Sequence, residues 1–313
     1  MPTEDYTKKC RGLSLLSGGL DSQLAVCVLR EAGAEVEGIT FVTPFFAPVA
    51  ARKAAAQLGV KLHEIDFTDD EIALIKAPPH GFGGAMNPCI DCHANMIRTA
   101  GEMIREMGFD FVSTGEVLGQ RPMSQNRQAL GIVARESGLE GRLVRPLSAQ
   151  LLEPTIPETE GLLDRSKLLS IQGRCREPQI ALAAEFGIVD YPSPAGGCKL
   201  TEEGYGRKLK DLKDHEGLGT RRLIELLAVG RHFRLPDGTG LIVGRDRIEN
   251  QTLYADKALG EFFDSGKLPG PGALLIGGAK SDSDRALAKK IVAAYTKGSG
   301  VTDREFFKPY HLY

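Results

Sequence analysis

The chain has 313 residues, of which 42% are hydrophobic and 26% charged, and its formal net charge is −2. These values are typical of a globular protein, and they exclude a disordered chain, a fibrous chain and a uniformly basic nucleic-acid-binding protein. No apolar run approaches the ~18 residues that a membrane-spanning helix needs, and the polar N-terminus lacks the layout of a secretion signal. We therefore expect a cytoplasmic protein without membrane contact, with about two domains.

Charge is distributed unevenly along the chain. Residues 1–199 contain 20 basic and 25 acidic side chains, whereas residues 200–313 contain 19 basic and 16 acidic ones. The mildly basic C-terminal part indicates an anionic partner, although a solvated surface of mixed charge explains the same numbers.

Apolar strands and helical patterns alternate in the first half of the chain. The expected strands lie at residues 12–16, 35–42, 60–67, 110–114 and 143–147. The expected helices lie at residues 23–31, 47–59, 69–76, 91–108 and 127–137. This alternation predicts an α/β domain with a parallel sheet and right-handed crossovers.

The later part of the chain is less regular. Residues 153–160 read as irregular, with short helices expected at 167–171 and 178–186. Further apolar segments lie at 223–228, 233–235, 240–243 and 273–276, with helices expected near 255–263 and at 282–295. The composition shifts to Gly, Lys and Asp around residues 201–219. We therefore expect one domain over residues 1–205 and a smaller α+β domain over residues 206–313.

A glycine-rich turn joins the first expected strand to the first helix. Its sequence is Ser17-Gly18-Gly19-Leu20-Asp21-Ser22. Two glycines allow a sharp turn and a close approach to an anion, which the amides of the helix N-terminus favour. Ser17 and Ser22 add hydroxyl donors, and Asp21 could hold Mg²⁺. The Lys-Ser/Thr pair of the nucleoside-triphosphatase P-loop is missing, which favours cleavage between the α- and β-phosphates. The structural alternative is a capped glycine turn.

Three cysteines have a spacing that indicates chemistry. Cys89 and Cys92 form a Cys-x-x-Cys pair in Asn87-Pro88-Cys89-Ile90-Asp91-Cys92, at the start of an expected helix. Cys198 ends the turn Ser193-Pro194-Ala195-Gly196-Gly197-Cys198.

Three interpretations of these cysteines remain open. A structural zinc site would use Cys89, Cys92 and Cys198 with Cys175 or His93 as the fourth ligand. Persulfide chemistry would place sulfur on Cys198, with Cys89 or Cys92 resolving the disulfide. A [4Fe–4S] cluster held by the three cysteines would leave one iron open for sulfide or substrate.

The hexapeptide Ser17–Ser22 resembles the PP-loop of the N-type ATP pyrophosphatases. This superfamily includes argininosuccinate, asparagine, NAD and GMP synthetases and the tRNA thiolation enzymes. The resemblance implies an adenine nucleotide alpha hydrolase-like fold, ATP and Mg²⁺ at the loop, and a substrate that becomes adenylated.

Further motifs resemble one branch of that superfamily. The segment Ser113-Thr114-Gly115-Glu116-Val117-Leu118-Gly119-Gln120, continuing to Ser124-Gln125, is similar to the second motif of tRNA 4-thiouridine synthetases. Arg145-Pro146-Leu147 matches their next motif, and residues 181–198 resemble the run that ends in their active-site cysteine, here Cys198. The Asn-Pro-Cys-x-x-Cys stretch resembles both tRNA 2-thiouridylases and cluster-bearing 4-thiouridine synthetases. The resemblance covers about residues 10–200.

This resemblance implies an ATP-dependent tRNA sulfurtransferase, which adenylates a uridine carbonyl oxygen and replaces it with sulfur. The implied nucleotide-binding residues are Ser17, Gly18, Gly19, Asp21, Ser22, Gly115, Glu116 and Gln120. The implied catalytic residues are Asp21, Cys89, Cys92 and Cys198, of which the three cysteines would hold a [4Fe–4S] cluster. The sulfur donor would be sulfide, a cysteine desulfurase or a sulfur carrier. The oligomeric state stays open, a homodimer included.

Other functions compete with this interpretation. The first is a cluster-free, persulfide-based thiouridylase, and the second is a PP-loop enzyme that inserts sulfur into a substrate other than RNA. An amide- or guanidino-forming ligase would not need three positioned cysteines, and a zinc-stabilised RNA-binding protein would not consume ATP. Two departures from the family pattern matter. No N-terminal RNA-binding domain or rhodanese-like tail is evident, and the insert at residues 153–176 has no counterpart.

The C-terminal part supplies a candidate RNA contact. Residues 230–235 (Gly-Arg-His-Phe-Arg-Leu) and 242–246 (Ile-Val-Gly-Arg-Asp), with Glu249-Asn250, resemble the RNA-binding module of the NFACT proteins. The resemblance implies phosphate contacts that position the RNA. The arginines implied are Arg231, Arg234, Arg245 and Arg247. The alternative is that these arginines form surface pairs with Asp237, Asp246 and Glu249.

Overall fold

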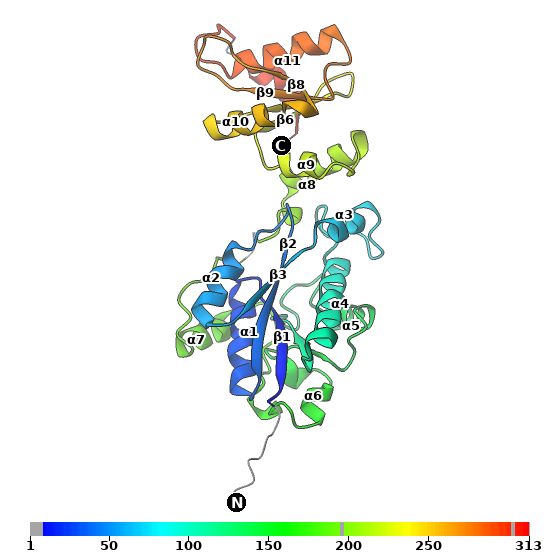
Figure 1. The fold of residues 1–313 in the computed structure, drawn as a ribbon, viewed down its shortest axis with the longest axis vertical. Helices are drawn as coiled ribbons and strands as arrows, with labels where there is room; N and C mark the ends of the chain where they lie inside the picture. Colours follow the sequence, from blue (N-terminus) through cyan, green and yellow to red (C-terminus); the bar gives the residue numbers. More distant parts are fainter. Residues whose placement is uncertain (1–8, 195–196, 302–303, 313) are drawn as a thin grey trace, which may run out of the picture. The chain divides into compact units, whose positions relative to one another are not determined.

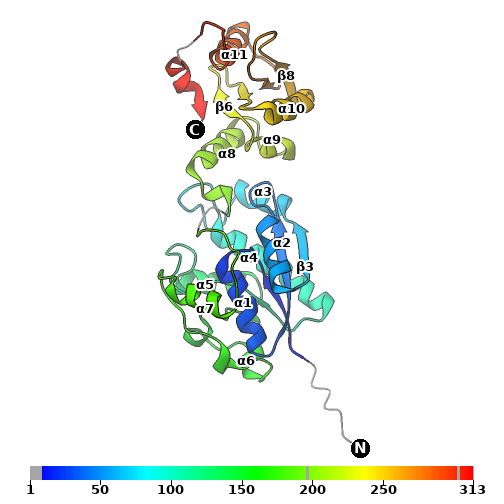
Figure 2. The same cartoon turned by 90° about the vertical axis from the view of Figure 1, so that its left-hand side faces the viewer.

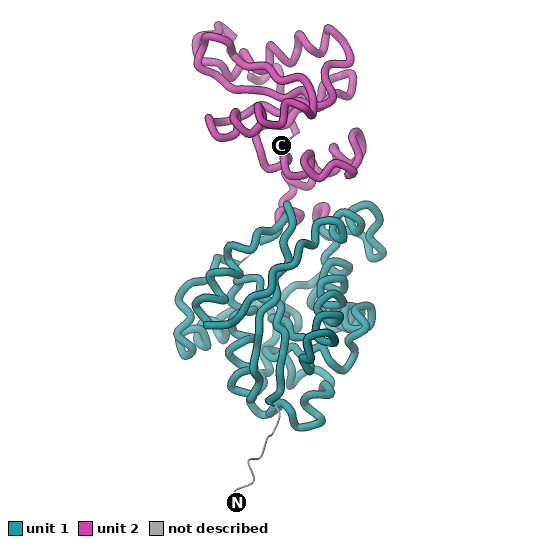
Figure 3. Tube along the Cα trace, in the orientation of Figure 1, with its two compact units in different colours: residues 1–83, 87–198 teal, residues 84–86, 199–313 magenta. Residues whose placement is uncertain are grey.

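The structure, a computed structural model, describes residues 9–194, 197–301 and 304–312. The chain divides into two compact units (Figure 3), one of residues 1–83 and 87–198 and the other of residues 84–86 and 199–313. Each unit is built around one five-stranded sheet. Within the described ranges, no helix is both long and apolar enough to cross a membrane.

The first unit contains a parallel sheet with the strand order β3-β2-β1-β4-β5. Its strands are β1 (Arg11–Leu15), β2 (Glu35–Val42), β3 (Leu62–Asp66), β4 (Phe111–Ser113) and β5 (Leu143–Val144). All four strand pairs run parallel. The predicted α/β class with a parallel sheet is therefore confirmed.

Helices cover both faces of this sheet (Figures 1 and 2). One face is covered by α1 (Leu20–Glu31), α2 (Val49–Leu58) and α7 (Glu177–Glu185), whose apolar residues share one core. The other face is covered by α3 (Thr68–Lys76), α4 (Cys89–Met107) and α5 (Arg127–Glu136) around a second core. A single turn, α6, spans Ile156–Thr159. Because α1 and α4 cover opposite faces, the connections reverse direction between β1 and β4, and open α/β sheets bind ligands at such a switch point.

Two glycines bring the sequence motifs together at this switch point. A Cβ atom on Gly115, just after β4, would lie 2.6 Å from the backbone of Asp21 and Ser22 at the start of α1. Gly18 has a φ of +86°, and a Cβ there would lie 2.3 Å from the backbone of Ala50. Only glycine permits these approaches. The phosphate loop and the second motif are therefore in direct backbone contact.

Two expectations for residues 153–171 are wrong in detail. The supposedly irregular segment contains the turn α6, which begins with a capping box between Thr155 and Glu158. The helix expected at 167–171 is absent; only a 3₁₀ turn at Arg165–Lys167 forms. The amides of Leu169 and Ile171 instead donate to the carbonyls of Pro146 and Leu147, both at 2.8 Å, so this segment runs extended beside the chain that follows β5.

The second unit contains an antiparallel sheet with the order β10-β6-β7-β9-β8. Its strands are β6 (Arg231–Arg234), β7 (Gly240–Val243), β8 (Gly260–Phe263), β9 (Ala273–Ile276) and β10 (His311–Leu312). Its helices are α8 (Glu203–His215), α9 (Arg221–Leu226), α10 (Arg247–Ala255) and α11 (Asp282–Ala294). Helix α11 packs on one face of the sheet, and α9 and α10 pack on the other. A second, smaller α+β unit is confirmed.

One expected feature of this unit needs correction, and two further segments form helices that the sequence analysis did not assign. The helix predicted near 255–263 is wrong, because α10 ends at Ala255 and residues 260–263 form β8, paired with β9. The apolar segment 223–228 lies mostly in α9. The polar stretch 201–219 contains α8, whose few apolar side chains at Tyr205, Leu209 and Leu212 all fall on one buried face. In the sequence, three apolar residues at helical spacing are outnumbered by the charged residues around them, so this helix is hard to recognise.

Candidate functional site

The phosphate loop is open for an anion. Helix α1 begins after Gly19, and no side chain caps its first amides. The Ser22 hydroxyl donates to the Gly19 carbonyl at 2.8 Å, and the exposed Ser17 hydroxyl lies 3.3 Å from that of Ser22. Uncapped amides at a helix N-terminus, with hydroxyl groups beside them, form an anion-binding site. The structure thus places Ser17, Gly18, Gly19 and Ser22 together, as the sequence predicts.

The Asp21 carboxylate lies beside this loop, and only one of its two oxygens accepts a hydrogen bond. Gln120 donates to Asp21 Oδ2 at 3.1 Å, whereas the buried Oδ1 has no hydrogen-bond partner. Burial raises the pKa of Asp21, opposed by the Gln120 hydrogen bond and by the charges of Arg176 and Arg121. A buried oxygen without a partner needs an explanation, and a bound cation provides one. The pairing of Asp21 with Gln120 links the two predicted motifs.

Two residues that sequence reasoning missed surround the same carboxylate. Gln179 is 0% exposed, neither atom of its side-chain amide has a partner, and the buried Nε of Arg176 has none either. Both residues act on the pKa of Asp21, so they lie close to it. The Gly173 amide donates to the Leu118 carbonyl at 2.7 Å, which fixes their segment against the second motif. Cys175, which precedes Arg176 in the chain, is exposed.

Glu116 is a buried carboxylate with every oxygen engaged. Its Oε2 accepts from Arg145 Nε at 2.8 Å and from Thr114 Oγ1 at 3.0 Å, and its Oε1 lies 3.0 Å from His93 Nδ1. Burial opposes ionisation, but the charge of Arg145 and the hydrogen bond from His93 outweigh it, so the pKa of Glu116 falls well below its usual value. The sequence grouped Glu116 with nucleotide-binding residues, whereas its contacts lie within the protein. These contacts join Glu116 to the end of β4, to α4 and to the chain after β5.

The structure brings Cys89, Cys92 and Cys198 together. Cys92 is buried, and its pKa is raised well above the usual value by burial first, then by Glu71, Cys198 and Cys89. Asn87 donates its amide to Cys89 Sγ at 3.2 Å. A helix N-terminus lowers the pKa of a thiol, but at Cys92 burial outweighs this effect. Ala195 and Gly196, in the turn before Cys198, lie outside the described residues.

The spacing of these thiols bears on which metal group they could hold. Among the described residues, the only three metal-ligating side chains with donor atoms within 4.8 Å of one another are His80, Asp91 and Glu136. The three cysteine sulfurs are thus spaced more widely. Zinc–sulfur bonds of about 2.3 Å place sulfurs in a tetrahedral site about 3.8 Å apart. At least one pair of the cysteine sulfurs is therefore farther apart than a preformed zinc site would place them.

Neither predicted fourth zinc ligand joins the cysteines. His93 turns to Glu116, and Cys175 is exposed. The His80 group does not offer a metal site either, because both ring nitrogens of His80 face carboxylates: Asp91 at 2.7 Å and Glu136 at 3.2 Å. The hydrogen bond to Asp91 raises the pKa of His80, which favours the protonated ring.

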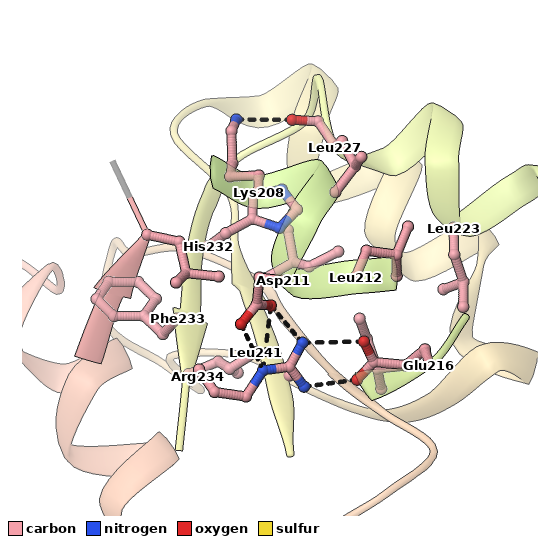
Figure 4. Close-up of a pocket in the computed structure, with 14 residues that line it drawn as sticks. Lys208, Asp211, Leu212, Glu216, Leu223, Leu227, His232, Phe233, Arg234 and Leu241 are labelled. Carbon is pink, nitrogen blue, oxygen red and sulfur yellow. Dashed lines mark hydrogen bonds and ion pairs between the residues drawn. The ribbon is translucent and has the colours of Figure 1, made fainter. Parts of the chain in front are cut away.

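The four arginines predicted to contact RNA differ in availability. Arg234 is largely buried between Asp211 and Glu216, with Nη1 2.6 Å from Glu216 Oε1 (Figure 4). Arg245 Nε donates to Glu249 at 2.9 Å. Arg231 stacks on Tyr295, with 4.6 Å between the guanidinium carbon and the ring centre. Arg247 is exposed at the start of α10, and within the described part of the chain its side chain forms no ion pair or hydrogen bond.

The cavity beside Arg234 is a small packing cavity and not a ligand-binding pocket. It has a volume of about 10 Å³, room for a single water (Figure 4). Lys208 at its rim donates to the Leu227 carbonyl at 2.7 Å, and burial lowers the pKa of His232 to about 3, so this ring is neutral.

Comparisons with known families match both parts of the chain. Residues 7–150 match the family model of the thiamine biosynthesis protein (ThiI), and residues 230–305 match that of the NFACT protein RNA-binding domain. Both matches confirm the resemblances read from the sequence.

Curated relatives agree with the first match. A tRNA-specific 2-thiouridylase of Chloroflexus aurantiacus is 31% identical over 255 residues, 72% of this chain and 65% of its own. That of Symbiobacterium thermophilum is 27% identical over 64% of this chain and 55% of its own. A probable tRNA sulfurtransferase of Thermoanaerobacter is 31% identical over 34% of this chain and 29% of its own. The chain spans between 29% and 66% of the length of these curated relatives.

Among solved structures, a 4-thiouridine synthetase–RNA complex with bound ATP aligns with 69% of this chain and 52% of its own, at 21% identity. Its TM-score of 0.41 is too low to support an argument.

The ion pair of Arg145 with Glu116 yields a stability prediction. Arg145→Met leaves a buried carboxylate without its cation, so we expect the free energy of unfolding at pH 7 to fall by about 3–5 kcal/mol. The lowered pKa of Glu116 stabilises the native protein fully above the ordinary value of 4.5, and this stability is lost gradually as pH falls from there toward the lower native pKa. In the variant, the uncompensated carboxylate takes up a proton as pH falls, so the deficit should shrink between pH 7 and pH 5.

Urea unfolding at both pH values measures this effect. Arg142→Met is the control, because Arg142 is exposed and donates only to the Asp110 carbonyl. The control should change stability by less than about 1 kcal/mol. A deficit at Arg145 that is equal at both pH values would contradict the assignment of Glu116 as an ionised anchor.

Proposed function

We propose that this protein, in which a ThiI-family PP-loop domain is followed by an NFACT-type RNA-binding domain, is an ATP-dependent tRNA sulfurtransferase. The observation that carries the proposal is that one unit holds both an anion-binding loop with unsatisfied groups around Asp21 and three gathered cysteines. A ligase of the same superfamily has no use for those cysteines. A binding module has no use for an open phosphate loop.

The first step is activation of a uridine. The ATP phosphates bind the uncapped amides of α1 and the hydroxyls of Ser17 and Ser22. Asp21 holds Mg²⁺ through its free oxygen, and Arg176 takes over part of the role of the P-loop lysine. A uridine carbonyl oxygen attacks the α-phosphorus, the bond to the β-phosphate oxygen breaks, and pyrophosphate leaves. The oxygen then belongs to an AMP group, which is a good leaving group.

The second step replaces that oxygen by sulfur. A sulfur nucleophile forms the C–S bond, and the C–O bond breaks as AMP leaves. A [4Fe–4S] cluster, when bound by Cys89, Cys92 and Cys198, would supply an iron site for sulfide. Burial raises the pKa of Cys92, so its binding to a metal would require the loss of the thiol proton. Asn87 orients Cys89 through its amide.

A persulfide on Cys198 is the second candidate for sulfur delivery. Cys198 is half-buried, whereas Cys92 is buried. An accessible thiol at the end of a glycine-rich turn can receive sulfur from a desulfurase or a carrier without any metal. Both routes use the same activation step. In the persulfide route the outer sulfur forms the C–S bond as AMP leaves, the thiol of Cys89 or Cys92 breaks the S–S bond, and the resulting disulfide is reduced by an external thiol.

The second unit is proposed to hold the RNA. Arginine contacts to phosphates position RNA without reading its sequence. Arg247, which is exposed and unpaired among the described residues, and Arg231 at β6 are the candidates of first choice. Arg234 would have to give up two ion pairs, and Arg245 one. We propose residues 1–205 as the catalytic part and 206–313 as the RNA-binding part.

Variants of Asp21 and Cys198 separate the two chemical steps. With oxygen excluded and unmodified tRNA, ATP and sulfide supplied, Asp21→Asn should lower pyrophosphate release by at least about 100-fold, because the metal loses its anchor. Cys198→Ser should release pyrophosphate but form no thionucleoside. Cys175→Ser, which changes an exposed thiol outside the trio, should leave both readouts unchanged. Thiolation that persists in Asp21→Asn would refute the nucleotide site.

Arg176 offers an independent test of nucleotide binding. Arg176→Ala should weaken binding of an uncleavable ATP analogue with Mg²⁺ by about 10- to 100-fold, the loss expected for a hydrogen bond between charged groups. Arg174→Ala is the matched control, because Arg174 is exposed on the same segment and does not act on Asp21. Isothermal titration calorimetry measures both. Equal affinities for the two variants would remove Arg176 from the site.

A further inference from the structure

We propose that Glu71 is a fourth protein ligand, beside Cys89, Cys92 and Cys198, of the metal group in this unit. The inference rests on the metal-dependent form of the proposed function and deepens it. Neither the sequence motifs nor the family matches point to this residue.

The Glu71 side chain has an environment that a carboxylate rarely occupies alone. Glu71 lies on α3, which packs against α4, and it is 0% exposed. Neither of its carboxylate oxygens has a hydrogen-bond partner. Glutamates are almost never buried in this way unless they are paired or bind a metal. Burial of the Glu71 carboxyl without a hydrogen-bond partner is therefore energetically unfavourable.

The partner that is present is the cysteine cluster. The Cys92 thiol lies beside the Glu71 carboxyl, although not in a geometry that forms a hydrogen bond, and the pKa of Cys92 also responds to Cys89 and Cys198. Cys92 thus lies at the centre, with two thiols and one carboxyl around it. These four groups are all acids, and a cation that binds them would replace their protons with charge compensation.

No side-chain cation serves that purpose among the described groups that act on Glu71. Apart from Cys92, the groups that act on the pKa of Glu71 are His93, Asp70 and Asp91. Two of these are acids, and His93 is already hydrogen-bonded to Glu116. Burial raises the pKa of Glu71 to about 7. A fully buried, unpartnered carboxyl beside the Cys92 thiol has the properties of a ligand.

A carboxylate would give this site one exchangeable position. Oxygen is a harder donor than thiolate sulfur and is held less firmly by iron. Glu71 would occupy the fourth position until the sulfur donor arrives and would then yield it. The three cysteines would keep the group in place during the exchange. The need for one weakly held donor beside three firmly held ones explains why the fourth donor is not a fourth cysteine.

The nearest alternative is a purely structural role, in which a protonated Glu71 packs against the Cys92 thiol. The two roles predict opposite behaviour. A structural carboxyl stabilises the metal-free protein, so its replacement should lower the melting temperature. A ligand without its metal is an unsatisfied buried group, so Glu71→Gln should preserve or raise the melting temperature of the metal-free protein while weakening metal binding.

The test uses the full chain, reconstituted without oxygen with ⁵⁷Fe and sulfide. Mössbauer spectra of the wild type should show one iron with a distinct, oxygen-ligated signature. In Glu71→Gln this signature should disappear, and iron should be lost to a chelator at least about 10-fold more readily. Asp70→Asn is the matched control, since Asp70 is the exposed neighbour on α3. Should Glu71→Gln not fold, Glu71→Asp decides, because it should retain the distinct iron.

Each of the possible results tests a different claim. Unchanged spectra and iron retention in Glu71→Gln would overturn the role of Glu71 while leaving the metal-dependent function intact. A wild-type protein that thiolates tRNA without binding iron would overturn both the ligand role and the cluster but not the sulfurtransferase. A lower melting temperature of metal-free Glu71→Gln, with iron binding unaffected, would establish the structural role instead.

Discussion

The buried carboxylate of Glu116 is the contact that joins the two halves of the site. It receives Arg145 from the chain after β5, Thr114 from the end of β4 and His93 from α4, one residue after Cys92. The cysteine helix is thereby fixed to the same strand end whose Gly115 packs on the phosphate loop. A sulfur site and a nucleotide site must act on one substrate atom in turn. A charged anchor with every oxygen engaged keeps their spacing constant.

The two halves share a second property, which is polar atoms that the protein itself leaves unsatisfied. Around Asp21 these are a carboxylate oxygen, the amide of Gln179 and one nitrogen of Arg176. Around Cys92 these are both oxygens of Glu71. Native proteins satisfy nearly all their buried polar groups, so clusters of exceptions mark places where a ligand completes the structure. One cluster contains a cation and an amide and suits phosphates with Mg²⁺. The other consists of acids and suits a metal group.

Periodicity and motif reading predicted the parallel sheet, most helices of the first unit and the residues that form the phosphate loop. Strand β2 and strand β9 have the predicted bounds, because short apolar runs between turn signals leave few alternatives. Gln179, Arg176 and Glu71 could not be found in this way. Each acts through burial and contact across elements distant in the chain, and Glu71 reads in the sequence as part of the ordinary acidic start of α3. Glu116 shows the converse: its motif was recognised, but its partners Arg145 and His93 decide what it does.

The most direct test of this account is the analysis of tRNA nucleosides by mass spectrometry after incubation with the protein, ATP and sulfide in the absence of oxygen. The account predicts a uridine in which one oxygen is replaced by sulfur, formed only when ATP is present and accompanied by equal amounts of AMP and pyrophosphate. ATP cleavage to AMP and pyrophosphate with no sulfur in the RNA would contradict it and would point to a substrate other than tRNA.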